Sequence, residues 1–115
     1  MTRRVWIIGP VAIDRVAYVQ SLPTLGSFTR PLRTVERIGG SSGNIALALA
    51  ETGVETGFIS YIGDDANGET IRQRFLESRI RHLHLKRVLG ESNSALVMID
   101  KIGRASCRER VYVLV

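Results

Sequence analysis

The sequence predicts an α/β fold in which buried strands are followed by helices. The main observation is a glycine turn, Gly-Gly-Ser-Ser-Gly-Asn at residues 39–44, that opens the apolar run of residues 45–50. Glycines allow a positive φ and the close approach of another molecule. A glycine turn at a helix N-terminus also suits a polar or anionic ligand. Apolar runs at residues 5–8 and 58–62 are typical of strands that are covered on both faces.

The first strand is expected over residues 5–9, and a hairpin-like flap of two strands follows it. Residues 15–20 and 32–38 each alternate between polar and apolar side chains, which indicates strands with one buried face. Pro23 and Gly26 mark the turn between them. The flap is therefore inserted between a core strand and its helix.

Two helices are expected. The first runs from Ser42 or Gly43 to about Thr52, with Gly53 at its C-cap, and because it is apolar on nearly every side it is a core helix. The second follows Gly63, with Asp64 or Asp65 as its N-cap. We interpret the carboxylates of residues 63–69 as helix-capping and turn residues, in preference to a catalytic or Mg²⁺-binding role.

Two further strands are expected near residues 82–85 and 94–99. His82 and His84 lie on one face of the first of these strands, opposite Leu83 and Leu85. A third metal ligand is not apparent, so we predict a polar outer face there and no metal site.

In their order and spacing these segments resemble the N-terminal part of the ribokinase/PfkB family of sugar and nucleoside kinases. The sharpest matches are the glycine turn at residues 39–44 and Gly-Asp-Asp-x-x-Gly-Glu at residues 63–69, and the likeness covers roughly residues 4–100. The resemblance implies the N-terminal part of a ribokinase-like three-layer α/β sandwich, truncated, with a small β-sheet lid. The lid strands would fall within about residues 15–38 and 82–100. A lid of this kind excludes water from phosphoryl transfer.

The resemblance also implies a sugar-binding set, whose members are Asp14, Gly39, Gly40, Ser41 and Asn44, with Ser92 and Ser94 as weaker candidates. The chemistry is suitable, because a carboxylate can accept hydrogen bonds from two neighbouring hydroxyls and glycines offer accessible backbone N–H groups. Three positions depart from the family: Ala12 where ribokinases have Asn, Ser41 where they have Lys, and Ser42 where Gly, Ala or Pro is usual. These departures favour a fructokinase-like or other sugar or nucleoside kinase over ribokinase itself.

Other parts of the family's machinery have no counterpart in this sequence. The catalytic base of the family is an Asp in a Gly-Ala-Gly-Asp-like turn, and the ATP pocket and the Mg²⁺-associated Asn-x-x-Glu segment also lie toward the C-terminus. None of these occurs here, and no P-loop occurs either. The expectation is a fragment of a kinase that uses ATP and Mg²⁺ to phosphorylate a sugar or nucleoside hydroxyl. The fragment itself is expected to be inactive, with no catalytic, cofactor-binding or metal-binding residue, and the complete protein to form a homodimer.

The resemblance to kinases is not expected to extend over residues 101–115. Residues 102–111 resemble one translated reading frame of a common short-read sequencing adapter, so we expect residues 1–100 to be the kinase part and residues 101–115 a non-native tail. The chain carries 16 basic and 11 acidic residues, a net charge of +5. Four of those basic residues and one acidic residue lie in the tail, which leaves only +2 on residues 1–100. The charge is thus poor support for nucleic-acid binding.

The composition argues against a disulfide-stabilised, a secreted or a membrane-spanning protein. Cys107 is the only cysteine and lies in the tail, so a disulfide framework is excluded, which fits a cytoplasmic protein. Arg3 and Arg4 before an apolar run imitate a signal peptide, but Pro10 and Asp14 interrupt it, and no run is long enough to span a membrane. Two alternatives stay open: a non-catalytic sugar- or nucleotide-binding module, and a basic domain whose arginine-rich tail binds nucleic acid.

Overall fold

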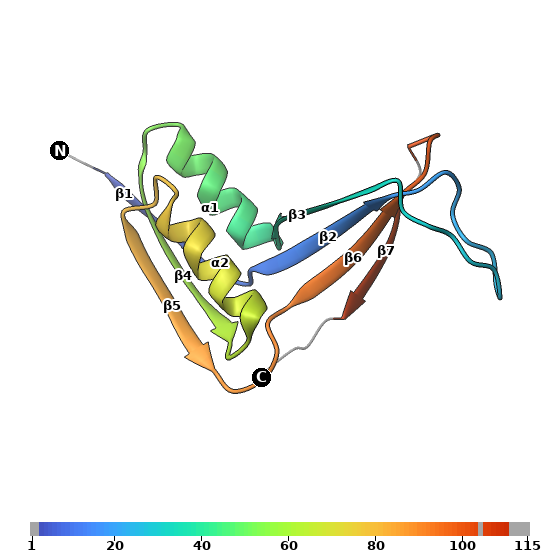
Figure 1. Cartoon of the computed structure of the whole chain (residues 1–115). Coiled ribbons are helices and arrows are strands. Elements are labelled where there is room, and N and C mark those ends of the chain that lie inside the picture. The colour runs from blue at the N-terminus through green and yellow to red at the C-terminus, as the bar shows by residue number, and fades with distance from the viewer. Residues whose placement is uncertain (1–2, 104, 111–115) are drawn as a thin grey trace.

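The chain forms two sheets and two helices. The computed structural model describes residues 3–103 and the backbone of residues 105–110. The elements follow in the order β1 (Arg4–Ile8), β2 (Ala12–Tyr18), β3 (Arg33–Gly39), α1 (Ser41–Glu51), β4 (Glu55–Gly63), α2 (Ala66–Leu76), β5 (His82–Val88), β6 (Ser94–Ile99) and β7 (Ala105–Arg110). Figure 1 shows the two sheets meeting near the start of α1 and the start of β6.

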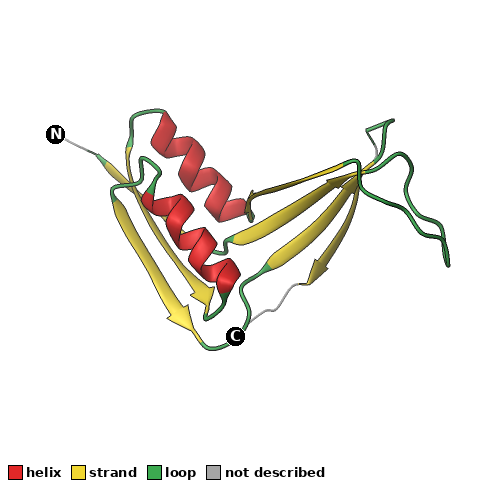
Figure 2. Cartoon of the chain, in the orientation of Figure 1, coloured by secondary structure: helices red, strands yellow, loops and turns green. Residues whose placement is uncertain are grey.

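The first sheet is parallel, with strand order β1-β4-β5. Both helices lie against one face of it, as Figure 2 shows. This arrangement follows from the sequence, since each parallel pair needs a crossover connection that carries a helix across the sheet. The predicted α/β class is confirmed.

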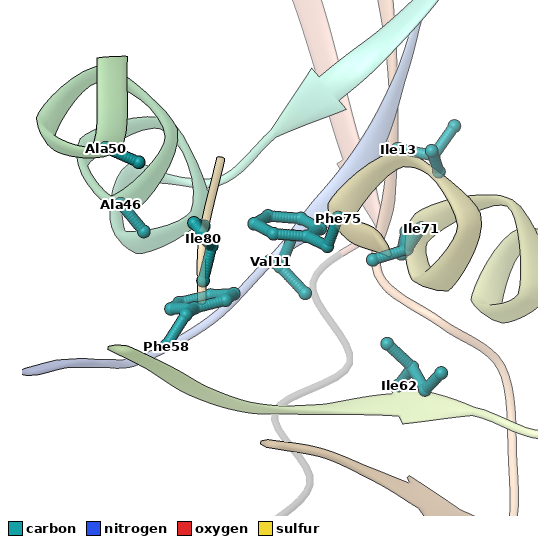
Figure 3. Packing of buried hydrophobic residues seen from close by; sticks show 9 residues of the cluster. All are labelled: Val11, Ile13, Ala46, Ala50, Phe58, Ile62, Ile71, Phe75 and Ile80. Atoms are coloured by element: carbon teal, nitrogen blue, oxygen red, sulfur yellow. The ribbon is translucent and has the colours of Figure 1, made fainter. Parts of the chain in front are cut away.

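The core lies between this sheet and the two helices (Figure 3). Phe58 of β4 stacks on Phe75 of α2 with ring centroids 5.0 Å apart, and both side chains are fully buried. The complete cluster consists of nine buried apolar residues: Val11, Ile13, Ala46, Ala50, Phe58, Ile62, Ile71, Phe75 and Ile80. Because Val11 directly precedes β2 and Ile13 lies within it, the core anchors the second sheet to the first.

The second sheet has strand order β3-β2-β6-β7. Strand β2 pairs antiparallel with β3 and parallel with β6. The antiparallel pair β2–β3 is the predicted flap, inserted between β1 and α1. It begins earlier than expected, at Ala12 in place of Arg15, so that Asp14 lies inside a strand and not in a connecting loop.

One boundary of the expected lid is wrong. The expected lid range of about 82–100 includes residues 82–88, but these form β5, which pairs with β4 in the first sheet. The second sheet therefore takes up the chain again only at Ser94. Strand β7 lies within residues 101–115 and pairs antiparallel with β6.

The helix boundaries agree with the sequence to within a residue or two. Helix α1 ends at Glu51 with Thr52 as C-cap, and Gly53 directly after it has φ +88. Helix α2 has Asp65 as its N-cap, one of the two predicted residues. No described helix is long and apolar enough to cross a membrane.

The second face of the first sheet carries no helix in the described part of the chain. Trp6 and Ile8 of β1 and Tyr61 of β4 are 41%, 72% and 43% exposed there. Apolar side chains on both faces are typical of parallel sheets that have helices on both sides. The exposed apolar side chains match the expectation that the first sheet is part of a larger sheet.

Candidate functional site

The candidate site lies where β2, β3 and the start of α1 meet. Gly40 joins β3 to α1 with φ +83 and ψ 137, a conformation that side chains rarely adopt. A Cβ at Gly40 would lie 3.0 Å from both the Pro10 carbonyl oxygen and the Val11 Cα. The second glycine of the turn is therefore required both by its backbone conformation and by close packing.

Gly43, in the first turn of α1, is also required by packing. It is buried, and its amide donates to the carbonyl oxygen of Pro10 at 3.3 Å. A Cβ there would lie 2.8 Å from Val11 Cγ2. The first turn of α1 is thus pressed onto residues 10 and 11, so any movement of these two residues would move the helix start.

Asp14 and Gly39 are brought together by the β2–β3 pairing. Ala12 of β2 lies opposite Gly39 of β3, and Asp14 lies opposite Arg37. Asp14 and Gly39 are therefore diagonal neighbours on one face of the sheet. The place that a Cβ on Gly39 would take is filled by the carboxylate of Asp14. Gly39 is buried and Asp14 is half-buried. A carboxylate therefore lies directly beside the turn that opens α1.

The start of α1 adds polar groups to this corner. Ser41 and Asn44 are exposed in the first turn, and the amide of Asn44 makes the first helical bond, to Gly40 at 3.1 Å. The amides before it have no acceptor within the helix, and the helix dipole makes this end positive. The first turn holds no acidic residue. The corner thus combines hydrogen-bond acceptors and donors, which suits a ligand rich in hydroxyls.

The two weaker candidates are placed differently. Ser94 is aligned with Ile13 in the parallel β2–β6 pair, so it shares the face of Ile13 and not that of Asp14. Ser92 is buried, and its hydroxyl both accepts a bond from the Gly63 amide at 2.8 Å and donates one to Asp65 at 2.7 Å. The structure brings neither side chain to Asp14.

The acidic segment at residues 63–69 caps a helix. Asp65 accepts hydrogen bonds from the Gly68 amide, the Ser92 amide and the Ser92 hydroxyl, each at 2.7–2.8 Å. Burial raises the pKa of Asp65, but these three bonds outweigh it and hold the pKa below the ordinary value. The preferred interpretation of Asp65 as a capping residue is confirmed.

The other two carboxylates of the segment both contact Arg87 on the surface, and Glu69 also pairs with Arg72 at 3.3 Å. Arg87 lies 3.7 Å from Asp64 and 2.9 Å from Glu69. The hydrogen bond from Arg87 lowers the pKa of Glu69. Among the described residues, no group of three or more His, Cys, Asp or Glu side chains could hold a metal ion.

The two histidines lie on a polar and aromatic face. His82 is 2.8 Å from Glu55, and the rings of His82 and His84 lie 5.9 and 5.8 Å from the ring of Trp6. On the opposite face of β5, Leu83 and Leu85 pack against the core. The predicted outer face is confirmed, with Trp6 as an aromatic member that the sequence did not suggest.

The acid sensitivity of the fold tests the role of Asp65. A carboxyl whose pKa is lowered by folding stabilises the protein above its ordinary pKa, here 3.8, and this contribution is lost as the pH falls through the folded-state value. We therefore expect the difference in unfolding free energy between wild type and Asp65→Asn to be larger at about pH 7 than at about pH 2.5. Urea unfolding at both pH values measures it. A difference that does not change with pH would contradict the assignment.

Comparison with known proteins identifies the family. The model of the family described as pfkB family carbohydrate kinase matches residues 2–107, which is nearly the whole chain. The chain belongs to the pfkB family. The glycine turn, Asp14 and the residue 63–69 segment all lie within the matched residues, so the resemblance inferred from these motifs is confirmed.

The relatives of this pfkB-family chain include two that are named as kinases. It is 31% identical over 115 residues to the bifunctional protein HldE of Nitratiruptor sp., covering 88% of this chain and 24% of the relative. It is 30% identical to the ribokinase of Haemophilus influenzae (88% and 33%) and 29% identical to the aminoimidazole riboside kinase of Salmonella typhimurium (84% and 27%). The chain thus spans a quarter to a third of the length of these relatives.

Solved structures show that the fold is ribokinase-like. The ribokinase of Giardia lamblia superposes with a TM-score of 0.82 at 24% identity, covering 96% of this chain and 33% of that one. The ribokinase of Arabidopsis thaliana, solved with ribose and ATP, superposes with a TM-score of 0.77 at 23% identity (95% and 36%). At these identities the likeness establishes the fold of the pfkB-family chain and not its substrate.

Proposed function

We propose that this chain is the sugar-binding part of an ATP-dependent carbohydrate or nucleoside kinase, and that it does not transfer phosphate by itself. The observation that carries the proposal is the position of the Asp14 carboxylate, against Gly39 and beside the first turn of α1. Membership of the pfkB family supports the reaction class. The Arabidopsis ribokinase bound to ribose and ATP supports the pair of substrates.

In this proposal Asp14 binds two neighbouring hydroxyls of the sugar and so orients the ring. Gly39 makes room for this carboxylate, and the turn at Gly40 brings the first turn of α1 beside it. Ser41 and Asn44 in that turn bond further hydroxyls. Holding the acceptor in a single orientation accounts for a large part of the acceleration in phosphoryl transfer, because such reactions depend mainly on positioning and charge stabilisation. The second sheet would act as the lid that excludes water.

In this proposal ATP and Mg²⁺ are not bound by the residues of this chain. The carboxylates of residues 63–69 are engaged in capping and ion pairs, and the sequence has neither a P-loop nor a Gly-Ala-Gly-Asp turn. We therefore place both groups, and the catalytic base, on the part of the kinase that is absent from this sequence.

The direct experiment begins at the source DNA. Independent reading across codons 90–115 should show a reading frame that departs from this sequence near codon 101 and continues to a Gly-Ala-Gly-Asp-like turn. The protein encoded by that frame is then assayed for ATP-dependent phosphorylation of sugars and nucleosides, with the 115-residue chain beside it. Phosphorylation by the long protein alone is the expected result. A confirmed stop codon after Val115, or sugar binding without phosphorylation, would instead favour a binding module.

A second test addresses the contact between Asp14 and Gly39. In the complete kinase, Gly39→Ala is expected to displace the carboxylate, and a displacement of about 1 Å can cost about 100-fold in activity. Gly39 has no positive φ, so alanine introduces no backbone strain, only the collision. Thr34→Ala, at an exposed position of the same strand, is the control. Equal kcat/KM values for wild type and Gly39→Ala would show that Asp14 does not need this position.

A further inference from the structure

The carboxylate of Asp65 makes more contacts than a helix cap requires. The Gly68 amide alone satisfies the capping interaction, at 2.8 Å from Oδ1. The Ser92 hydroxyl also donates to Oδ1 at 2.7 Å, and the Ser92 amide donates to Oδ2 at 2.8 Å. Ser92 is 27 residues away in the sequence, in the connection from β5 to β6. Asp65 therefore joins the start of α2 to the segment that enters the second sheet. Figure 1 shows the two elements, α2 and the connection from β5 to β6.

The contact between Asp65 and Ser92 is buried and closely packed. Ser92 is only 5% exposed, and its hydroxyl accepts the Gly63 amide at 2.8 Å. A Cβ on Gly63 would collide with the backbone of residues 90–92, and one on Gly68 would collide with the Gly63 carbonyl oxygen. Both glycines of the residue 63–69 segment are explained by this packing, so the position of Ser92 is set by the end of β4 and the start of α2.

Asn93, which follows Ser92, forms hydrogen bonds with the residues next to the candidate site. The carbonyl oxygen of Asn93 accepts the Ile13 amide at 3.0 Å, and its side-chain amide lies 3.5 Å from the Val11 carbonyl oxygen. Val11 and Ile13 are 1% and 0% exposed. Ile13 directly precedes Asp14, and Val11 packs against Gly40 and Gly43 at the start of α1. Residues 10–13 are thus held between Asn93 on one side and the first turn of α1 on the other.

We infer that Asp65 is a positioning residue for the sugar site: through Ser92 and Asn93 it fixes β2, and with it the carboxylate of Asp14, relative to the start of α1. The inference rests on the proposed function. Because the connection runs through hydrogen bonds to a charged group, the neutral Asp65→Asn side chain weakens it while keeping its shape. Asp65 touches no substrate, so it acts on the reaction only through the placement of the acceptor sugar.

The test is a comparison of kinetic constants in the complete kinase. We expect Asp65→Asn and Ser92→Ala each to raise the KM for the sugar about tenfold. This is less than the loss of about 100-fold that a displacement of about 1 Å can cause. The KM for ATP is expected to stay unchanged. Asp64→Asn is the matched control, since Asp64 is the neighbouring exposed carboxylate and its side chain pairs with Arg87 on the surface. A shift in both KM values, the same shift in the control, or no shift would overturn the inference.

Hydrogen exchange on the same proteins separates this inference from the proposed function. Asp65→Asn and Ser92→Ala are expected to speed exchange of the Ile13 amide at least about tenfold over Asp64→Asn, since this amide bonds to Asn93. If the wild-type protein phosphorylates no sugar, the proposed function fails, and the exchange rates then decide whether Asp65 positions β2. Equal exchange in all the variants would overturn the positioning role whatever the activity.

Discussion

Replacing Asp14 with asparagine in the complete kinase is expected to lower kcat/KM for the sugar by about 10²–10³-fold. The substitution keeps the size of a side chain that fills the space against Gly39, but it removes the charge. Two hydrogen bonds from hydroxyls to a charged acceptor contribute about 1.5–3 kcal/mol each, and a loss of about 3–4 kcal/mol in total corresponds to this factor. Steady-state phosphorylation kinetics measure it.

The control for this prediction is Glu36→Gln on β3. Glu36 is an exposed carboxylate of the same sheet that pairs with Arg15 at 3.4 Å. Removing its charge changes the net charge of the protein by the same amount and leaves the corner at Gly39 intact. If Asp14→Asn and Glu36→Gln have equal kcat/KM values, Asp14 does not bind the acceptor.

The largest effect on stability is expected for Phe75→Ala. Phe75 is fully buried in α2 and stacks on Phe58 at 5.0 Å. Truncating a buried phenylalanine costs about 3–5 kcal/mol, because apolar contacts are lost and a cavity remains. Proteins of this kind have only about 5–15 kcal/mol of stability in total. The variant is therefore expected to lose a large share of its free energy of unfolding and to unfold at a clearly lower urea concentration than the wild type.

Leu76→Ala is the matched control, since Leu76 is the next residue of the same helix and is 53% exposed. Leucine and alanine are both good helix formers, so the helix itself is little affected. Urea unfolding followed by circular dichroism compares the two variants with the wild type. Similar losses for Phe75→Ala and Leu76→Ala would contradict the described packing of α2 on the first sheet.

Local patterns predicted most of the elements. The apolar runs and glycine caps gave α1 to within a residue or two at each end, since both signals come from neighbouring residues. Asp65 was one of two residues named as the N-cap of α2 for the same reason. The pairing of residues 82–88 with β4 was missed, because alternation shows that a segment is a strand and does not show which strand lies beside it.

The arrangement of the candidate site could not be predicted fully from the sequence. The glycine turn suggested the close approach of another molecule, which stays a prediction, and in the structure the Asp14 carboxylate fills the Cβ position of Gly39. The role of Ser92 was not predictable, because its partner Asp65 lies 27 residues earlier in the chain. Only the packing of α2 against the β5–β6 connection reveals this contact. The spacing of Gly63 and Gly68 was the one available signal, since both make room for the junction with Ser92.

The measurement that tests the central claim most directly is a structure of the complete kinase with its accepted sugar bound. We predict two neighbouring sugar hydroxyls within hydrogen-bond distance of the Asp14 carboxylate, with the ring next to Gly39 and Gly40 at the start of α1. A sugar bound elsewhere, with Asp14 making no contact to it, would contradict the assignment of this corner as the acceptor site.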